Sequence, residues 1–527
     1  MAQNGEKQSA PPKEGKGLPG GIFGRVAHAP AKNDSQSATR KTSTLDLADI
    51  QGFILRGYRM PMVRHFLLTV NIPAQARKML DRLVSGSETD APQITTAEDW
   101  HVGFAPGPGD DPTEAPRRKP DYCLNVGITW PGMNALEIRQ LVPNISFKSF
   151  GAFTEGAAAR AKLVGDTGAS SPENWIAAFQ KDEGHVMVTL HSISPDTMQA
   201  YTDRLVALFS EGNGFREIWR QDGMALIEMQ NGRPVPTAKV HFGYTDGISM
   251  TTIRGGPEKY PPDHQQPCEP WLFVLQDEAE NYMVPEPKQL GLNGSFAVFK
   301  MMETDVVGFE NFLQSNRDKI DPELLAAKMC GRWRNGVPLA LSPDTDSPSG
   351  LTPEQWNNFE YVNADGSGDP KGMRCPVGAH MRRINPRGQP VTGQGVPGGS
   401  NNTHRLIRRG LPYGPTYDPK QPYDGIARGL LGYFINSNIE NQYEFVLGHW
   451  VNDSEFAGAV RLNPKSKDPM IGTQHSAESI FVMPQPNGAP PIKVTGLSTF
   501  VTTKAAAYCF LPSITAIKFI ANLGVGQ

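Results

Sequence analysis

The sequence predicts an α+β protein made of two ferredoxin-like modules, each with an antiparallel sheet. Three observations support this prediction. In each half of the chain, segments with strand and helix periodicity follow one another in the order of a split β-α-β unit. A proline-rich stretch without clear periodicity, residues 248–290, separates the two halves. Hydrophobic residues make up 38% of the 527 residues, which is enough to bury a substantial core.

We therefore expect four segments along the chain. Residues 1–44 are rich in Gly, Pro, Ser, Lys and Gln and nearly lack large apolar residues, which indicates a flexible N-terminal arm. Residues 45–247 form the expected N-terminal module, and residues 248–290 form a connecting insert. Residues 291–527 form the expected C-terminal module.

The first half contains runs of both periodicities. Residues 185–191 alternate between apolar and polar side chains, as a half-buried strand does, and residues 194–196 are a good N-cap for the helix that follows. The predicted strands are residues 65–71, 121–130, 185–191 and 219–230. The predicted helices are residues 73–83, 134–141 and 196–210.

The second half repeats this alternation around a long irregular stretch. Val306, Phe309 and Phe312 fall on one face of a predicted helix, and residues 331–427 read as loop. The predicted strands are residues 294–300, 429–435, 499–503 and 507–510. The other predicted helices are residues 324–330, 438–450 and 514–523.

Composition excludes several classes of protein. The formal net charge of -3 comes from nearly balanced acids and bases, which argues against nucleic acid or an acidic membrane surface as the main partner. No apolar run reaches about eighteen residues, so we expect no membrane-spanning helix. The five cysteines form no Cys-x-x-Cys pair, and the N-terminus shows no secretory pattern. A cytoplasmic protein is the default, an extracellular one if a precursor was trimmed, and homo-oligomers are plausible.

One stretch concentrates chemically useful side chains. Residues 375–387 read Cys-Pro-Val-Gly-Ala-His-Met-Arg-Arg-Ile-Asn-Pro-Arg. Pro376 and Pro386 restrict the backbone on either side of His380. Guanidinium groups offer the paired donors that carboxylates need, and this stretch supplies three of them: Arg382, Arg383 and Arg387. An imidazole beside several guanidinium groups suggests an axial ligand to an anionic macrocycle.

Two further stretches complete a pattern. Residues 241–247 read His-Phe-Gly-Tyr-Thr-Asp-Gly, and residues 404–414 read His-Arg-Leu-Ile-Arg-Arg-Gly-Leu-Pro-Tyr-Gly. In this order, the three stretches resemble those of the dye-decolourising peroxidases, a family of haem enzymes. The resemblance runs from about Asp46 to the C-terminus. Shorter matches lie at residues 49–52, 294–299, 331–339 and 510–513.

The resemblance implies a function and a set of site residues. It implies one haem b per chain, bound mainly by the C-terminal module, with His380 as the axial ligand of the iron. Asp246 would be the distal acid–base and Arg408 the distal arginine. Hydrogen peroxide would be the oxidant, and dyes, phenols or similar small molecules the reductants. The residues expected to contact the cofactor are His380, Arg383, Arg408, Leu431 and Tyr433.

Several alternatives remain open at this point. Cys375 could ligate iron as a thiolate, and the Asp246–Gly247 pair could be an ordinary turn. Asp453 and Glu444 are both candidates for the carboxylate that hydrogen-bonds His380. Arg405 and Arg409 rank behind Arg408 as contacts for haem propionates or solvent.

The sequence also departs from the usual family pattern. Gly432 and Tyr433 stand where bulkier apolar residues are more usual, and residues 504–509 differ from the common pattern, which puts the shape of the pocket in doubt. Electron transfer to large dyes would need aromatic residues as relays, for which the candidates are Trp333, Tyr413, Trp450 and Tyr508.

Two rival functions belong to other classes. A haem carrier or chelatase could use the same pocket without productive turnover of peroxide. A protein without haem could use the three arginine-containing stretches to bind an anion instead.

Overall fold

A computed structural model provides the fold. It describes residues 44–98, 120–258, 265–277, 284–391, 401–418, 421–454, 456, 466–474 and 478–524. The predicted flexible arm, residues 1–44, lies outside the described residues except for Thr44. Thr44–Gln527 forms one unit.

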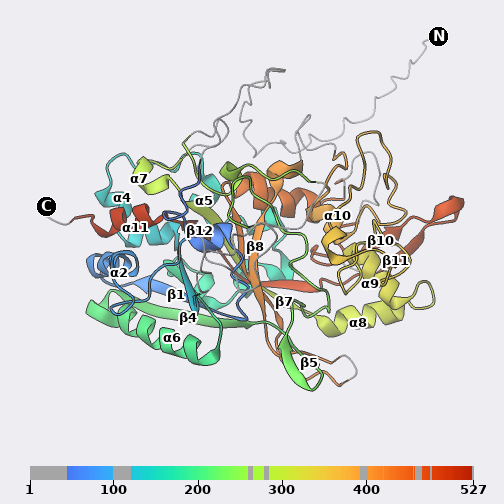
Figure 1. The fold of residues 1–527 in the computed structure, drawn as a ribbon, viewed down its shortest axis with the longest axis horizontal. Coiled ribbons are helices and arrows are strands. Elements are labelled where there is room, and N and C mark those ends of the chain that lie inside the picture. Colours follow the sequence, from blue (N-terminus) through green and yellow to red (C-terminus); the bar gives the residue numbers. More distant parts are fainter. Residues whose placement is uncertain are drawn as a thin grey trace, which may run out of the picture. The chain divides into compact units, whose positions relative to one another are not determined.

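An eight-stranded antiparallel sheet lies at the centre of this unit (Figure 1). One half of it has the order β4-β1-β3-β2, and the other half has the order β12-β7-β9-β8. In chain order, each half therefore runs fourth, first, third, second, which is the strand order of a ferredoxin-like module. The strands are β1 (Met62–Val70), β2 (Tyr122–Thr129), β3 (Val186–Ser192), β4 (Phe215–Met224), β7 (Ser295–Thr304), β8 (Ile407–Tyr413), β9 (Gly429–Asn436) and β12 (Val501–Leu511). The predicted fold class is confirmed.

The two halves are joined by a short pairing between β2 and β12, in which Cys509 lies opposite Thr129 and Phe510 opposite Ile128. The far edges of the sheet, β4 and β8, also approach each other. A Cβ added to Gly223 of β4 would lie 3.2 Å from the Pro412 carbonyl oxygen of β8. The sheet thus curls round and encloses an inner space between its halves.

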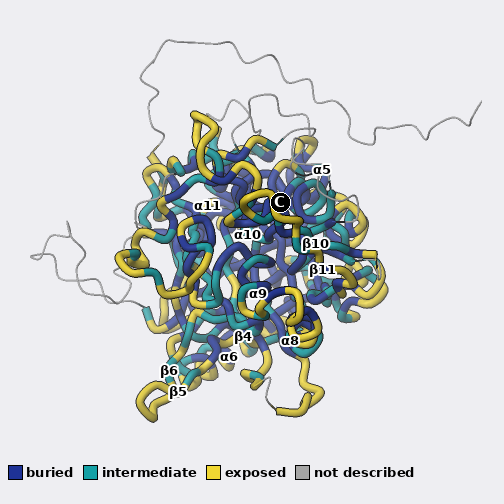
Figure 2. Tube along the Cα trace, turned by 90° about the vertical axis from the view of Figure 1, so that its right-hand side faces the viewer, coloured by how far each residue is buried: buried dark blue, intermediate teal, exposed yellow. Residues whose placement is uncertain are grey.

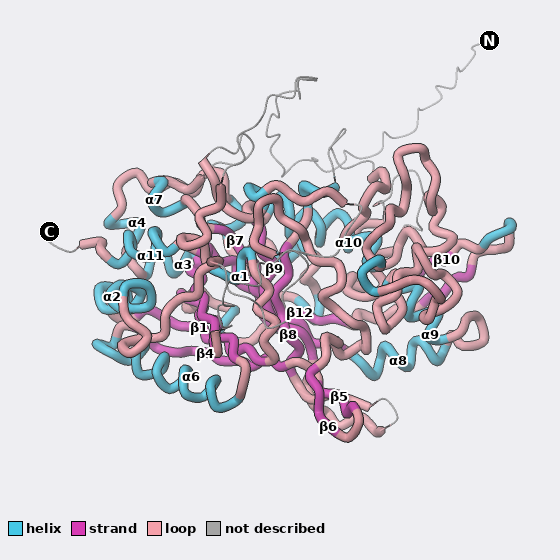
Figure 3. The backbone as a smooth tube through the Cα atoms, viewed as in Figure 1, coloured by secondary structure: helices cyan, strands magenta, loops and turns pink. Residues whose placement is uncertain are grey.

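Helices flank the sheet at both ends of the view in Figure 3, with long loops around α10. Local signals set several helix starts. The Ser194 hydroxyl accepts a hydrogen bond from Thr197 N at 3.2 Å, and the Asp321 carboxylate accepts one from Leu324 N at 2.9 Å. The helices are α1 (Gly52–Leu55), α2 (Pro73–Ser85), α3 (Trp130–Ala135), α4 (Ile138–Leu141), α5 (Gly151–Glu155), α6 (Pro195–Ser210), α7 (Lys288–Gly291), α8 (Val306–Ser315), α9 (Pro322–Cys330), α10 (His380–Ile384) and α11 (Ile514–Ala521).

The second half differs from the sequence prediction in several elements. Helix α10 lies within the stretch expected to be loop, and β10 (Ile480–Met483) and β11 (Ile492–Thr495) form a hairpin that was not predicted. Strand β8 lies within the stretch expected to be loop. The two strands predicted over residues 499–503 and 507–510 form the single strand β12, which continues through a register shift between Thr503 and Ala505. The predicted helix over residues 438–450 consists of two π-helical segments, Glu440–Glu444 and Val446–Val451.

In the first half, the predicted strand over residues 219–230 is broken. Strand β4 ends at Met224, and β5 (Ile227–Gln230) leaves the sheet to pair with β6 (Arg233–Pro236) in a hairpin. Figure 2 shows this hairpin projecting as a mainly exposed tip, because it packs few side chains. The described helices include none that is long and apolar enough to cross a membrane.

Candidate active site

The loop that carries Asp246 is folded back on itself. Val240 N donates to Tyr244 O at 3.0 Å, and Asp246 N donates to Ala238 O at 2.8 Å. Gly243 and Gly247 both have positive φ angles, 85° and 79°, which an L-residue rarely adopts. The glycines of this motif therefore let a tight loop present the Asp246 carboxylate to the cavity.

Arg408 reaches this carboxylate from β8. Its Nη2 lies 3.1 Å from Asp246 Oδ1, and Gly247 N donates to the same oxygen at 2.7 Å. Burial by itself raises the pKa of Asp246, but the charge of Arg408 and these hydrogen bonds outweigh it, so the pKa is lowered. The carboxylate is 40% exposed and lines a cavity. The pair therefore places an ionised carboxylate beside a guanidinium group.

His380 is the first residue of α10 and faces the same cavity. Its Nδ1 lies 2.9 Å from Oδ2 of the fully buried Asp468. Burial opposes ionisation of Asp468, but its contact with the His380 ring, the hydrogen bond from Ile471 N and the charge of Arg383 outweigh this effect and lower the pKa of Asp468. An ionised carboxylate can only accept, so the proton of a neutral imidazole sits on Nδ1 and leaves the Nε2 electron pair available to a metal.

The partner of His380 is not one of the two residues expected. The Asp453 carbonyl oxygen accepts from Arg383 Nη1 at 2.8 Å, whereas His380 Nδ1 is paired with Asp468. Glu444 forms an ion pair with Arg160 at 2.6 Å. Asp468 lies 88 residues after His380, next to a part of the chain outside the described residues. Sequence spacing gave no signal for it.

The expected role of Arg383 is corrected. Its guanidinium is fully buried and donates to the carbonyl oxygens of Gly378, Trp450, Asp453 and Ser466. Arg382 and Arg387 also donate to backbone carbonyls, and none of the three lines the cavity. These arginines hold the loops around α10 instead of offering donors to a cofactor.

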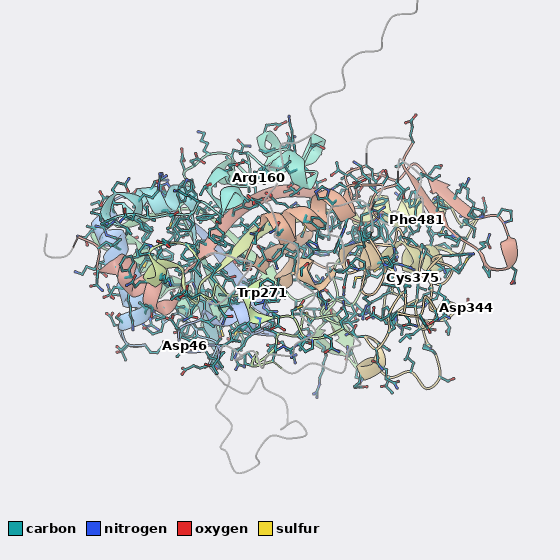
Figure 4. The ribbon with its side chains drawn as sticks, turned by 90° about the horizontal axis from the view of Figure 1, so that it is seen from above. Asp46, Arg160, Trp271, Asp344, Cys375 and Phe481 are labelled. Atoms are coloured by element: carbon teal, nitrogen blue, oxygen red, sulfur yellow. The ribbon has the colours of Figure 1, made fainter. Side chains whose placement is uncertain are left out.

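Cys375 is also excluded as an iron ligand. Burial raises the pKa of its thiol to about 11, which disfavours the thiolate. The residue is fully buried and does not line the cavity, whereas His380 does. Cys375 is labelled in Figure 4, in the same part of the molecule as Phe481.

The two residues of β9 that were predicted to contact the cofactor, Leu431 and Tyr433, line the cavity but lie on the opposite face of the strand from Arg408. Arg408 lies opposite Phe434 in the β8–β9 pairing, and residues directly opposite each other share a face. Leu430, Gly432 and Phe434 are therefore on the face of Arg408. Leu431 and Tyr433 point into the inner space, where the Tyr433 hydroxyl lies 2.7 Å from Thr189 Oγ1. The alternation of the strand was visible in the sequence, but its phase was not.

A cavity of about 420 Å³ brings His380, Asp246 and Arg408 together, and a second cavity of about 160 Å³ is also lined by all three. Leu430, Phe434 and other apolar side chains line the larger cavity, which lies within the range of about 300–1,000 Å³ usual for cofactor sites. At one end, Arg405 donates to Gln265 Oε1 at 2.6 Å and to Thr251 Oγ1 at 3.2 Å. These features fit haem. His380 offers an available ring nitrogen to the iron, the apolar walls suit the macrocycle, and the guanidinium of Arg405 suits a propionate carboxylate.

The aromatic residues considered as relays lie mostly inside the protein. Tyr413, Trp450 and Tyr508 are buried, and the Tyr508 hydroxyl donates to Glu444 Oε1 at 3.0 Å. Trp333 is half-buried and lines the smaller cavity. Their role as relays stays a prediction.

Comparison with known proteins gives consistent matches along the chain. The family model described as "DyP dimeric alpha+beta barrel domain" matches residues 49–225. "Peroxidase 2" of Mycetinis scorodonius is 28% identical over 503 residues, which cover 92% of this chain and 89% of that protein. The "Dye-decolorizing peroxidase" of Mycena epipterygia is 27% identical over 552 residues, covering 99% of this chain and 96% of that protein.

Solved structures resemble the whole fold. A dye-decolorizing peroxidase in complex with 2,6-dimethoxyphenol has a TM-score of 0.71 and 26% sequence identity, over 90% of this chain and 100% of that one. A single-residue variant of a dye-decolorizing peroxidase, in complex with cyanide, has a TM-score of 0.72 and 26% identity, over 91% and 100% of the two chains.

Proposed function

Since this chain belongs to the dye-decolourising peroxidase family, we propose that Asp246, Arg408 and His380 are the working residues of its active site. The protein is a haem-dependent peroxidase that oxidises dyes, phenols or similar one-electron donors. We propose haem b, one per chain, as its cofactor and hydrogen peroxide as its oxidant. When bound, the haem supplies the redox-active iron and the macrocycle that peroxide reduction requires.

In this proposal, Asp246 moves the proton. Peroxide reduction would require one proton to leave one peroxide oxygen and to reach the other, departing oxygen. Asp246 is suited to both steps because Arg408 and Gly247 N favour its ionised form. The turn that contains Asp246 leaves the carboxylate accessible from the cavity.

Arg408 stabilises the negative charge that develops as the oxygen–oxygen bond breaks. A guanidinium held in a largely apolar cavity does this more effectively than a group in bulk water. Its position on β8 is fixed by the pairing with Phe434 of β9 and by the contact with Asp246. Arg408 therefore both keeps Asp246 ionised and offers a donor to the departing oxygen.

His380 would hold the iron through Nε2, and Asp468 would fix the orientation and tautomer of the ring. Asp468 is itself fixed, since its Oδ1 accepts from Met470 N at 2.8 Å and from Ile471 N at 3.0 Å. Arg405 would contact a haem propionate at the polar end of the cavity.

The observation that carries the proposal is the convergence of His380, Asp246 and Arg408 on one cavity, although they come from stretches far apart in the sequence. The test loads the protein with haem and records its absorption spectrum before and after equimolar hydrogen peroxide, with 2,6-dimethoxyphenol as the reductant. We expect the Soret band to change with peroxide and to recover faster with the phenol.

The variant Asp246→Asn tests the proton-transfer role. We expect it to keep the Soret band and to lose about 100-fold or more in turnover, which is the usual contribution of a general acid–base. Asp222→Asn is the matched control, because Asp222 is also paired with an arginine, Arg64, but lies away from the cavity. Undiminished turnover by Asp246→Asn would mean that another group transfers the proton. In the unsubstituted protein, a Soret band that does not respond to peroxide would favour a haem carrier, and a colourless protein would favour an anion-binding protein without haem.

A further inference from the structure

The cavity that contains Asp246 and Arg408 also extends to the other side of β8. We call this second part the inner chamber and define it by six lining residues: Phe53, Tyr58, Met60, His191, Arg409 and Leu411. Arg409 lies opposite Tyr433 in the β8–β9 pairing, one position away from Arg408. Because successive side chains of a strand point to opposite faces, Arg409 faces the inner space between the sheet halves.

The walls of the inner chamber are mainly aromatic and aliphatic. Phe53 and Tyr433 meet edge to face with ring centroids 5.4 Å apart, and Tyr58 meets His191 in the same way at 5.1 Å. Phe53, Tyr58 and Met60 are buried, whereas Arg409 and Leu411 are partly exposed. The chamber therefore offers a largely aromatic and aliphatic lining to a small ring.

Arg409 brings a guanidinium to the inner chamber, and the hydrogen bonds that it donates to described residues go to backbone oxygens. Its Nε donates to Phe53 O at 2.8 Å, and Nη1 lies 3.4 Å from Arg408 O. Among the described residues it forms no ion pair with a carboxylate. The carboxylate of Glu258 is close by and accepts a hydrogen bond from Gly57 N at 2.5 Å. A partly buried guanidinium without a carboxylate is a good site for an anion.

Two imidazole nitrogens on this side of the sheet lack partners. His191 Nδ1 and His65 Nε2 are buried and make no hydrogen bond with the described residues. Buried polar atoms without partners are rare in native proteins, and an absent ligand or water is a usual reason. Burial, together with the charge of Arg409, lowers the pKa of His191 to about 3, so the ring is neutral and can donate from Nδ1.

From this arrangement we infer that the inner chamber binds a small aromatic carboxylate, such as a benzoate. The ring would lie among Phe53, Tyr58 and Leu411, and the carboxylate would accept from Arg409 and from His191 Nδ1. This site is separate from the peroxide site, since β8 lies between Arg409 and Arg408. The inference does not depend on turnover of peroxide.

The test is calorimetric titration of the haem-loaded full chain with benzoate, and with benzyl alcohol as the uncharged probe of the same ring. We expect benzoate to bind and benzyl alcohol to bind about tenfold or more weakly, because it lacks the charge that Arg409 recognises. The Soret band is recorded in parallel. Equal binding of the two probes, or no binding of benzoate at millimolar concentration, would overturn the inference.

Variants of Arg409 and Arg408 test on which face of β8 benzoate binds. Arg409→Gln should weaken benzoate binding about tenfold or more, whereas Arg408→Gln should leave it unchanged. Arg254→Gln is a control, because Arg254 is an arginine paired with Glu269 that does not line the cavity. Loss of binding in Arg408→Gln with retention in Arg409→Gln would move the ligand to the haem side and contradict the inference.

A last variant covers the case in which Arg409→Gln does not fold, which a missing Soret band would reveal. Leu411→Trp narrows the inner chamber and keeps the guanidinium. We expect this variant to keep its Soret band and to lose benzoate binding. Unchanged benzoate binding by Leu411→Trp would contradict the inference.

Discussion

At the scale of single residues, Arg408 and Arg409 show how strand geometry separates similar side chains. Both belong to the motif of residues 404–414, and the sequence ranks Arg408 first only through a family resemblance. In the structure, Arg408 lies 3.1 Å from Asp246, and Arg409 faces the inner chamber. Their roles differ because β8 directs them to opposite faces of the sheet.

The pairing of Arg408 with Asp246 predicts a pH effect. Burial alone raises the pKa of Asp246, and Arg408 is the largest of the influences that lower it. A lowered pKa keeps the carboxylate ionised as the pH falls. The loss of kcat/KM for peroxide on acidification, the acid limb of the pH profile, therefore lies at low pH. In Arg408→Gln, burial is no longer opposed by this charge, and the acid limb of kcat/KM for peroxide should shift to higher pH.

The pH dependence of kcat/KM, measured for both proteins at one ionic strength, checks this shift. Arg254→Gln is the control for loss of a positive charge elsewhere on the protein and should keep the original profile. An unshifted acid limb in Arg408→Gln would mean that another group sets it.

At the scale of elements, the cavity depends on a buried ion pair between β7 and the turn that contains Asp166. Lys300 of β7 contacts both carboxylate oxygens of Asp166 at 3.0 Å, and Thr503 of β12 donates to Asp166 Oδ1 at 2.6 Å. All three residues line the cavity. This pair ties a loop of the first half of the chain to two strands of the second half.

We expect Lys300→Met to lower the free energy of unfolding by about 3–5 kcal/mol, because it leaves the Asp166 carboxylate buried without its counter-charge. Urea unfolding of the two proteins measures the difference. The double variant Lys300→Met with Asp166→Leu removes both charges and should recover most of the loss. A double variant as unstable as Lys300→Met would show that lost packing, and not the unpaired charge, is responsible.

At the scale of the whole molecule, the narrow junction between β2 and β12 makes the two sheet halves one structure. Gly127 of β2 lies at this junction, where an added Cβ would be 3.1 Å from Cys509 Cβ and 3.2 Å from a methyl carbon of Leu511. Only glycine fits this approach without a shift of its neighbours.

Gly127→Val should therefore lower the free energy of unfolding by about 1–3 kcal/mol through overpacking. We expect a single urea transition in both proteins, followed by fluorescence and by circular dichroism, because the halves share one sheet. Two separate transitions in Gly127→Val would instead mean that the halves unfold independently. Val126→Ala, at the neighbouring position of β2, is a control for loss of packing without overpacking.

Local sequence patterns are sufficient to locate the elements with strong periodicity and the residues that carry a motif. Alternation or helical spacing located β1, β2, β3, β7 and β9 and the helices α2, α6, α8 and α9, because these patterns follow from which face of an element is buried. The three motifs also pointed to His380, Asp246 and Arg408, which the structure brings to one cavity. Their chemical roles remain proposals.

Which residues meet depends on how distant segments pack, and sequence patterns do not report it. Three findings depend on contacts between distant segments. Asp468 is the partner of His380, and Arg383 links loops through hydrogen bonds to their carbonyl oxygens. The pairing of β9 with β8 sets which of its residues share a face with Arg408. Strand β8 reads as loop because it contains Gly410 and Pro412 and lies at the edge of its half of the sheet, where burial leaves a weak pattern. Periodicity reports that one face is buried, but it cannot report what covers that face.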